Sequence, residues 1–137
     1  LSAGSDNKLF IWNVATAEIL TEISIHPDTI YSAVWNYNGS SIVTTCKDKR
    51  IRVFNPRTGA VLREGSGHQA TKPMRALFMR DGRIFTTGFS RTGERQYALW
   101  ESSTLEQIVM EDIDNSNGLL FPFYDEDTNI IYLCGKG

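Results

Sequence analysis

A hairpin-like pattern that recurs every 42 residues restricts the possible folds of this 137-residue chain more than any other feature. Its clearest copy is SIVTTCKDKRIRVFN, from Ser41 to Asn55. Apolar and polar residues alternate in both halves, which favours strands over helices, and the charged residues Lys47 to Lys49 between the halves indicate a turn. Asp6, Asp48 and Ser90 stand at equivalent positions, each 42 residues from the next. The chain is therefore predicted to be an array of β-hairpin units.

The repeat divides the whole chain into units of one kind. We expect an all-β fold of four-stranded sheets. Residues 1–18 would end one unit, 19–59 and 60–104 would each form a unit, and 105–137 would begin the next. The nearest helical candidate, residues 101–114, lacks an apolar stripe at positions i, i+3 and i+4.

Composition is that of a globular protein. Hydrophobic residues make up 41% and charged residues 22%, which argues against disorder. No apolar run approaches the roughly 18 residues that a membrane span needs, and no signal segment opens the chain. The chain begins at Leu1 and ends at Gly137 in mid-pattern, so we expect a piece of a longer protein. The open sheet edges of such a piece predict self-association.

The two cysteines, Cys46 and Cys134, fall late in equivalent strands of different units and form no C-x-x-C pair. Buried, reduced thiols are favoured over a disulfide or a metal site. Reduced thiols fit an intracellular compartment.

Charge is unevenly distributed along the chain, although the net charge is only −2. The segment from Lys47 to Arg95 holds twelve Lys and Arg against four acids, a balance of +8. The remaining segments have a balance of −10, and no basic residue occurs from Gln96 to Gly135. Two explanations stay open: solvated strand and loop surfaces, or an electrostatic docking surface for an acidic partner.

The two histidines, His26 and His68, stand 42 residues apart and so at the same position of successive units. His, Asp and Ser in one unit also occur in hydrolytic triads. The fixed recurrence and the lack of a nucleophile elbow favour a structural role, and two histidines in different units do not form a zinc site. Residues 65–70 imitate a dinucleotide-binding loop, but no helix follows them. We therefore predict no catalytic site, no metal and no cofactor.

Short motifs in the units resemble those of WD-repeat blades. They are Gly67-His68, Ser5-Asp6, Trp12-Asn13, Asp48 and Trp100-Glu101, in a repeat of about 40 to 45 residues. The resemblance implies β-propeller blades in which a His, a Ser or Thr, an Asp and a Trp form a hydrogen-bonded tetrad. The corresponding positions here are Ser2, Asp6 and Trp12; His26, Thr44, Asp48 and Phe54; and His68, Thr86, Ser90 and Trp100. Phe54 lacks an N–H donor, and Ser90 replaces the carboxylate.

Longer stretches are similar to coronins. They are His26-Pro27-Asp28, CKDKRIRVFNPRTG (46–59), KPMRALF (72–78), FTTGFSRTGERQYALW (85–100) and NGLLFPFYDEDTNIIYLCGKG (117–137). The resemblance implies about three central blades of a seven-bladed propeller. It also implies a non-catalytic, cytoplasmic protein of the cytoskeleton. Such a protein binds filamentous actin, modulates the actin-branching complex and associates with acidic phospholipids.

In a propeller, the hairpin tips and the loops that lead into the inner strands share one face, and here that face collects basic residues. We expect the actin contact there, at Lys47, Lys49, Arg50, Lys72, Arg91 and Arg95. The alternative is that these are solubilising loop charges. Two other functions stay open: a generic WD-repeat adaptor that binds peptides or proteins at the central channel, and a phosphoinositide-membrane-binding module. Nucleic acid is not expected, because the chain is acidic overall and the basic unit has few exposed aromatics.

Overall fold

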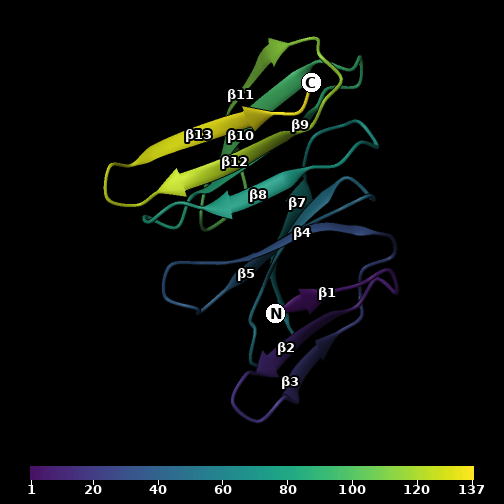
Figure 1. Ribbon diagram of the computed structural model, residues 1–137, viewed down its shortest axis with the longest axis vertical. Coiled ribbons are helices and arrows are strands. Elements are labelled where there is room, and N and C mark those ends of the chain that lie inside the picture. Colours follow the sequence, from purple (N-terminus) through teal and green to yellow (C-terminus); the bar gives the residue numbers. More distant parts are fainter.

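The computed structural model describes residues 1–137 as an all-β chain of thirteen strands (Figure 1). The strands are β1 (Ser2–Ala3), β2 (Leu9–Asn13), β3 (Glu18–Ile23), β4 (Ile30–Trp35), β5 (Ile42–Cys46), β6 (Arg50–Phe54), β7 (Val61–Ser66), β8 (Arg75–Phe78), β9 (Ile84–Phe89), β10 (Arg95–Trp100), β11 (Gln107–Asp114), β12 (Leu120–Asp125) and β13 (Ile130–Gly135). The predicted all-β class is confirmed. The chain contains no helix long and apolar enough to cross a membrane.

The strands form antiparallel sheets in which consecutive strands are hydrogen-bonded neighbours. β4 to β7 make one four-stranded sheet and β8 to β11 make another. A three-stranded sheet, β1 to β3, precedes them, and the pair β12–β13 follows. The inner strands β4, β8 and β12 lie side by side with β8 in the middle (Figure 1). This is the arrangement of successive propeller blades.

The sheets are offset from the units that the sequence repeat defines. β3 opens the predicted unit 19–59 but pairs with β2, and so completes the first sheet. In the same way β7 opens the unit 60–104 but pairs with β6. The outer strand of each sheet thus comes from the next repeat. Because the repeat boundary falls within a sheet, one repeat contributes strands to two successive sheets.

Turns between the strands are fixed by short polar side chains and by left-handed backbone. In the turn after β6, Asn55 Oδ1 accepts a hydrogen bond of 2.9 Å from the N–H of Arg57, and Gly59 has a φ of 73°. At the tip of the β5–β6 hairpin, Lys49 has a φ of 71°, and its N–H donates to the carbonyl of Cys46 at 3.0 Å. The charged turn expected at this position is therefore present.

Apolar side chains fill the spaces between successive sheets. The cluster between the first and second sheets consists of Leu9, Ile11, Ile23, Ile42 and Phe54. The cluster between the second and third consists of Val43, Ile51, Val53, Ala76, Phe78, Ile84, Ala98, Trp100 and Leu105. The second sheet is therefore covered on both faces, and every residue of β5 is buried. Burial of each large apolar side chain contributes about 1.5–3 kcal/mol to stability.

The two cysteines are free thiols in different environments. Cys46 is buried in β5, and burial raises the pKa of its thiol. Cys134 was expected to be buried as well, but it is exposed. The reason is that β13 lies at the edge of a two-stranded sheet.

Replacing Phe54 by Ala tests the packing between the first two sheets. Phe54 is fully buried, and we expect Phe54→Ala to lower the free energy of unfolding by about 3–5 kcal/mol. Urea denaturation measures the loss. Val14, which is 93% exposed, supplies the control, because Val14→Ala should change stability by less than about 0.5 kcal/mol. Equal losses in the two variants would contradict the packing described above.

Candidate functional site

A buried chain of hydrogen bonds connects the loop before β8 to β9 and β10. Nε2 of His68 lies 2.8 Å from Thr86 Oγ1, and Trp100 Nε1 donates to the same hydroxyl at 2.8 Å. Nδ1 of His68 lies 3.0 Å from Gln96 Oε1. His68 and Thr86 are completely buried. These bonds hold the loop against the sheet and satisfy polar groups that burial removes from water.

Only one arrangement of protons satisfies this network. Gln96 Nε2 donates to Asp112 Oδ1 at 2.8 Å, so Gln96 Oε1 faces His68 as an acceptor. His68 must then carry its proton on Nδ1, while its Nε2 accepts from the Thr86 hydroxyl. The imidazole is neutral, and burial lowers its pKa. The geometry makes His68 a structural connector and not an acid or base.

Ser90, which the repeat aligned with Asp48, takes no part in the His68 network. Its hydroxyl is hydrogen-bonded to Glu94 within the tip of the β9–β10 hairpin. Hydrogen bonds from Ser90 and Thr92 lower the pKa of the Glu94 carboxyl. Gln96 fills the place expected for Ser90, because the lengthened tip carries Ser90 away from the histidine. The signal in the sequence was the spacing, because Ser90 stands ten residues before Trp100 whereas Asp48 stands six residues before Phe54.

The equivalent network in the second sheet is rewired. Nε2 of His26 lies 2.9 Å from Thr44 Oγ1, and the imidazole packs at 5.3 Å, centroid to centroid, on the ring of Phe54. Asp48 does not bond to His26, because its carboxylate is paired with Arg52. Nδ1 of His26 is buried without a hydrogen-bond partner. Burial, and secondly the charge of Arg52, lower the pKa of His26 to about 4.

Arg52 explains why Asp48 is unavailable to the histidine. Its side chain is only 6% exposed, and its Nη2 also lies 3.2 Å from a carboxylate oxygen of Glu64. Burying a guanidinium is costly unless carboxylates pair with it and accept its hydrogen bonds. Arg52 therefore holds Asp48 in an ion pair. The signal in the sequence was an Arg between Ile51 and Val53, inside a strand that is otherwise apolar.

In the first sheet, part of the expected set is brought together. Trp12 Nε1 donates to Ser2 Oγ at 2.9 Å. Asp6 is not in this contact, since its carboxylate accepts from the backbone N–H of Lys8 at 3.2 Å. The Ser2–Trp12 bond joins β1 to β2, and Asp6 stabilises the turn between them.

Two of the six basic residues expected at a docking surface are paired within the fold. Arg95 donates through Nε and Nη2 to the two carboxylate oxygens of Asp114, at 2.6 Å each. It is only 8% exposed, and its hydrogen bonds lower the pKa of Asp114. Arg50 donates to Glu64 at 2.7 Å. Arg95 thus joins β10 to β11 and is not the surface residue that the sequence suggested.

The other four cations form what we call the basic tip face: Lys47, Lys49, Lys72 and Arg91. None of them belongs to an ion pair of the structure. The loop before β8 bridges the two hairpin tips, because the N–H of Gly67 donates to the carbonyl of Lys49 at 2.7 Å and the N–H of Ala70 to that of Phe89 at 3.2 Å. Lys72 Nζ lies 4.4 Å from the centroid of the Phe89 ring. The four charges are therefore carried by segments that touch one another.

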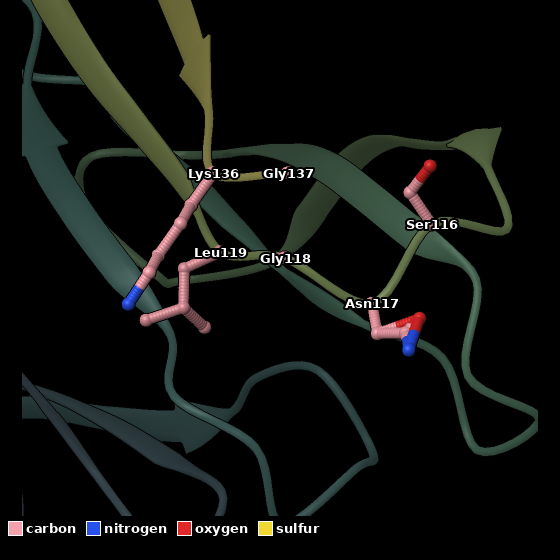
Figure 2. A pocket seen from close by; sticks show the side chains of 6 residues that line it. All are labelled: Ser116, Asn117, Gly118, Leu119, Lys136 and Gly137. Atoms are coloured by element: carbon pink, nitrogen blue, oxygen red, sulfur yellow. The ribbon is translucent and has the colours of Figure 1, made fainter.

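The largest pocket, of about 620 Å³, lies beside the end of β13 and is lined by Ser116, Asn117, Gly118, Leu119, Lys136 and Gly137. Figure 2 shows the side chain of Lys136 directed away from those of Ser116 and Asn117. The polar side chains that line this pocket therefore do not converge on one point. No group of three or more His, Cys, Asp or Glu residues is arranged to hold a metal ion.

Adding a methyl group at Gly88 tests the His68 network. A Cβ at this position would lie 2.5–2.7 Å from three side-chain atoms of His68. We expect Gly88→Ala to displace the imidazole and to lower the free energy of unfolding by about 1–3 kcal/mol, measured by urea denaturation. Gly65→Ala is the matched control, because its Cβ would meet Leu105 at an ordinary 3.5 Å. Equal stabilities of the two variants would contradict the close approach.

Acidification tests the neutral state of the histidines. Folding lowers the pKa of both, to about 4 for His26, so below pH 6.5 the unfolded chain binds protons that the folded chain excludes. Stability should fall as the pH drops from about 6.5 towards 4, by up to about 1.4 kcal/mol per pH unit for each histidine. Urea denaturation at pH 7, 6 and 5 measures the slope, and His26→Gln should reduce it. A stability that rises on acidification would refute a neutral His26 in the folded state.

Comparison with known proteins agrees with this geometry. The family model "WD domain, G-beta repeat" matches residues 17–55. The crystal structure of the WD40 domain from Toxoplasma gondii coronin aligns with a TM-score of 0.91 and 30% identity, over 98% of this chain and 36% of that chain.

Two more distant structures share the fold alone. The computationally designed Ika8 protein aligns with a TM-score of 0.71 and 20% identity, over 96% of this chain and 37% of its own. The Myceliophteria thermophila Cps50 (Swd1) β-propeller domain aligns with a TM-score of 0.71 and 12% identity, over 97% of this chain and 43% of its own. The chain thus spans less than half the length of each of these three structures. Residues 17–55 thus match a WD repeat, and the fold of the whole chain is that of successive WD40 β-propeller blades, similar in structure to those of the Toxoplasma gondii coronin domain.

Proposed function

We propose that this chain is part of a coronin-type propeller that binds filamentous actin through the basic tip face and so regulates actin dynamics. WD40 propellers mediate protein–protein interaction and are generally non-catalytic, so a binding role suits the fold. The coronin assignment is supported by the 30% identity to the Toxoplasma gondii domain over 98% of this chain. The same resemblance suggests a cytoplasmic location with the cytoskeleton, and the actin-branching complex as a further partner.

The observation that carries the proposal is the set of four cations without acidic partners on one face. Actin filaments are acidic, and complementary charge increases the rate of association and orients the encounter. Lys47 and Arg91 stand exposed at the tips of adjacent hairpins, and Lys72 is exposed on the loop between them. Arg50 and Arg95 are left out of the proposed contact, because Glu64 and Asp114 already neutralise them.

Reversing the charge of the tips tests this contact. We expect the triple variant Lys47→Glu, Lys49→Glu, Arg91→Glu to lower the affinity for actin filaments about tenfold or more, measured by co-sedimentation, because attraction becomes repulsion. The matched control is Arg57→Glu with Arg80→Glu. These two exposed residues lie in the turns after β6 and β8, at the opposite end of the strands, and their reversal should leave binding within about twofold of the original.

Unchanged binding by the triple variant would remove the basic tip face as the actin contact. The same face would also attract acidic phospholipids, so vesicles containing phosphatidylserine provide a second measurement. Binding to vesicles but not to filaments, with a steep dependence on salt, would replace the actin proposal by a membrane one. Filament binding that the control variant abolishes would instead place the contact on the opposite face.

A further inference from the structure

A pocket of about 260 Å³ lies between the inner strands of three successive sheets. It is lined by Ser32, Ala33 and Val34 from β4, Arg75 and Ala76 from β8, and Phe121, Pro122 and Phe123 from β12. β8 lies between the other two strands (Figure 1), so the pocket is an open groove bordered by β4 on one side and β12 on the other. Each of the three strands is the edge strand of its own sheet, which leaves backbone groups on the pocket side free to hydrogen-bond a ligand.

Arg75 is the only charged residue of this pocket, and its hydrogen-bonding capacity is unused. Its guanidinium lies 5.0 Å from the centroid of the Phe121 ring, which positions the planar group without occupying its N–H donors. Nε is buried and has no hydrogen-bond partner, and Arg75 belongs to no ion pair. Arg52 and Arg95, by contrast, are each matched to a carboxylate. A buried donor without an acceptor is costly, so an acceptor bound in the pocket would relieve this cost for Arg75. Arg63 Nε is also buried without a partner, but Arg63 does not line the pocket.

We propose that this pocket binds a carboxylate of an extended peptide, with an apolar side chain of the same peptide next to it. None of the lining residues is acidic, so nothing competes for Arg75. The guanidinium can hold a carboxylate through two parallel hydrogen bonds. The walls are mostly apolar, and Phe123 is 57% exposed, which offers a surface for an aromatic or aliphatic neighbour.

Carboxylate fits the pocket better than phosphate does. A phosphate group carries close to two negative charges at neutral pH, and only one cation lines the pocket. The second charge would be moved from water to a mostly apolar wall without compensation. The pocket also contains none of the four residues of the basic tip face, so this site and the actin contact are separate.

The test uses the full chain and two acetylated, amidated tetrapeptides, Gly-Asp-Phe-Gly and Gly-Asn-Phe-Gly, titrated by NMR. We expect the Asp peptide to bind and to shift signals from Arg75 and Phe121. The Asn peptide should bind at least about tenfold more weakly, which is the loss expected for a charge-assisted hydrogen bond. Arg75→Gln should weaken the Asp peptide to the same extent. Arg91→Gln, an exposed residue of the tip face, is the matched control and should bind the peptide unchanged.

Three results would overturn the proposal. They are equal binding of the two peptides, no binding of the Asp peptide at roughly millimolar concentration, and inorganic phosphate that shifts the same signals more strongly. If Arg75→Gln does not fold, Phe123→Ala replaces it, because this exposed ring should be needed for the peptide and not for stability. Co-sedimentation of Arg75→Gln with actin filaments should be unchanged, so failure of either proposal is recognised separately.

Discussion

Burial of both faces of a sheet between its neighbours is the constraint on which the other features of this structure depend. Every residue of β5 is buried, including Thr44 and Thr45, so each polar group there needs a partner inside the protein. Thr45 Oγ1 donates to the carbonyl of Met74 at 2.8 Å, just before the inner strand of the next sheet. Thr87 makes the same bond one repeat later, to Leu120 at 3.0 Å. Polar side chains thus connect sheets whose contact is otherwise apolar.

The two histidine networks show how one position of the repeat accommodates different surroundings. His68 is satisfied on both nitrogens, whereas His26 is satisfied on one and packs its ring on Phe54. The difference originates in the nearby side chains. In the third sheet Gln96 hydrogen-bonds to His68, whereas in the second sheet Asp48 is paired with Arg52 and does not bond to His26. Both imidazoles remain neutral because they are buried. In both repeats the histidine holds the loop before the inner strand against its sheet, although its hydrogen-bond partners differ.

The fold also sorts the positive charges that are concentrated between Lys47 and Arg95. Three arginines that lie within sheets, Arg50, Arg52 and Arg95, are paired with acids on the adjoining strand or hairpin tip. Cations at hairpin tips and in the loop between them remain unpaired, because these segments face water. Arg63 and Arg75 are the exceptions, because each has a buried Nε without a hydrogen-bond partner and belongs to no ion pair; Arg75 is in addition stacked on Phe121. Both proposed binding sites depend on cations that have no acidic partner within the fold.

The sequence by itself determined the strands, their hairpin turns, the period of the array and the alignment of His26 with His68. These features depend on the local alternation of apolar and polar residues and on fixed spacing along the chain, both of which can be read directly from the sequence. Only the tertiary structure decided that Gln96 and not Ser90 bonds to His68, that Asp48 pairs with Arg52, and that Arg95 is buried. It also brought Arg75 against Phe121 across two sheets. Such partnerships depend on the distances between side chains on different strands and sheets. A repeat pattern shows which positions are equivalent, but it contains no information about those distances.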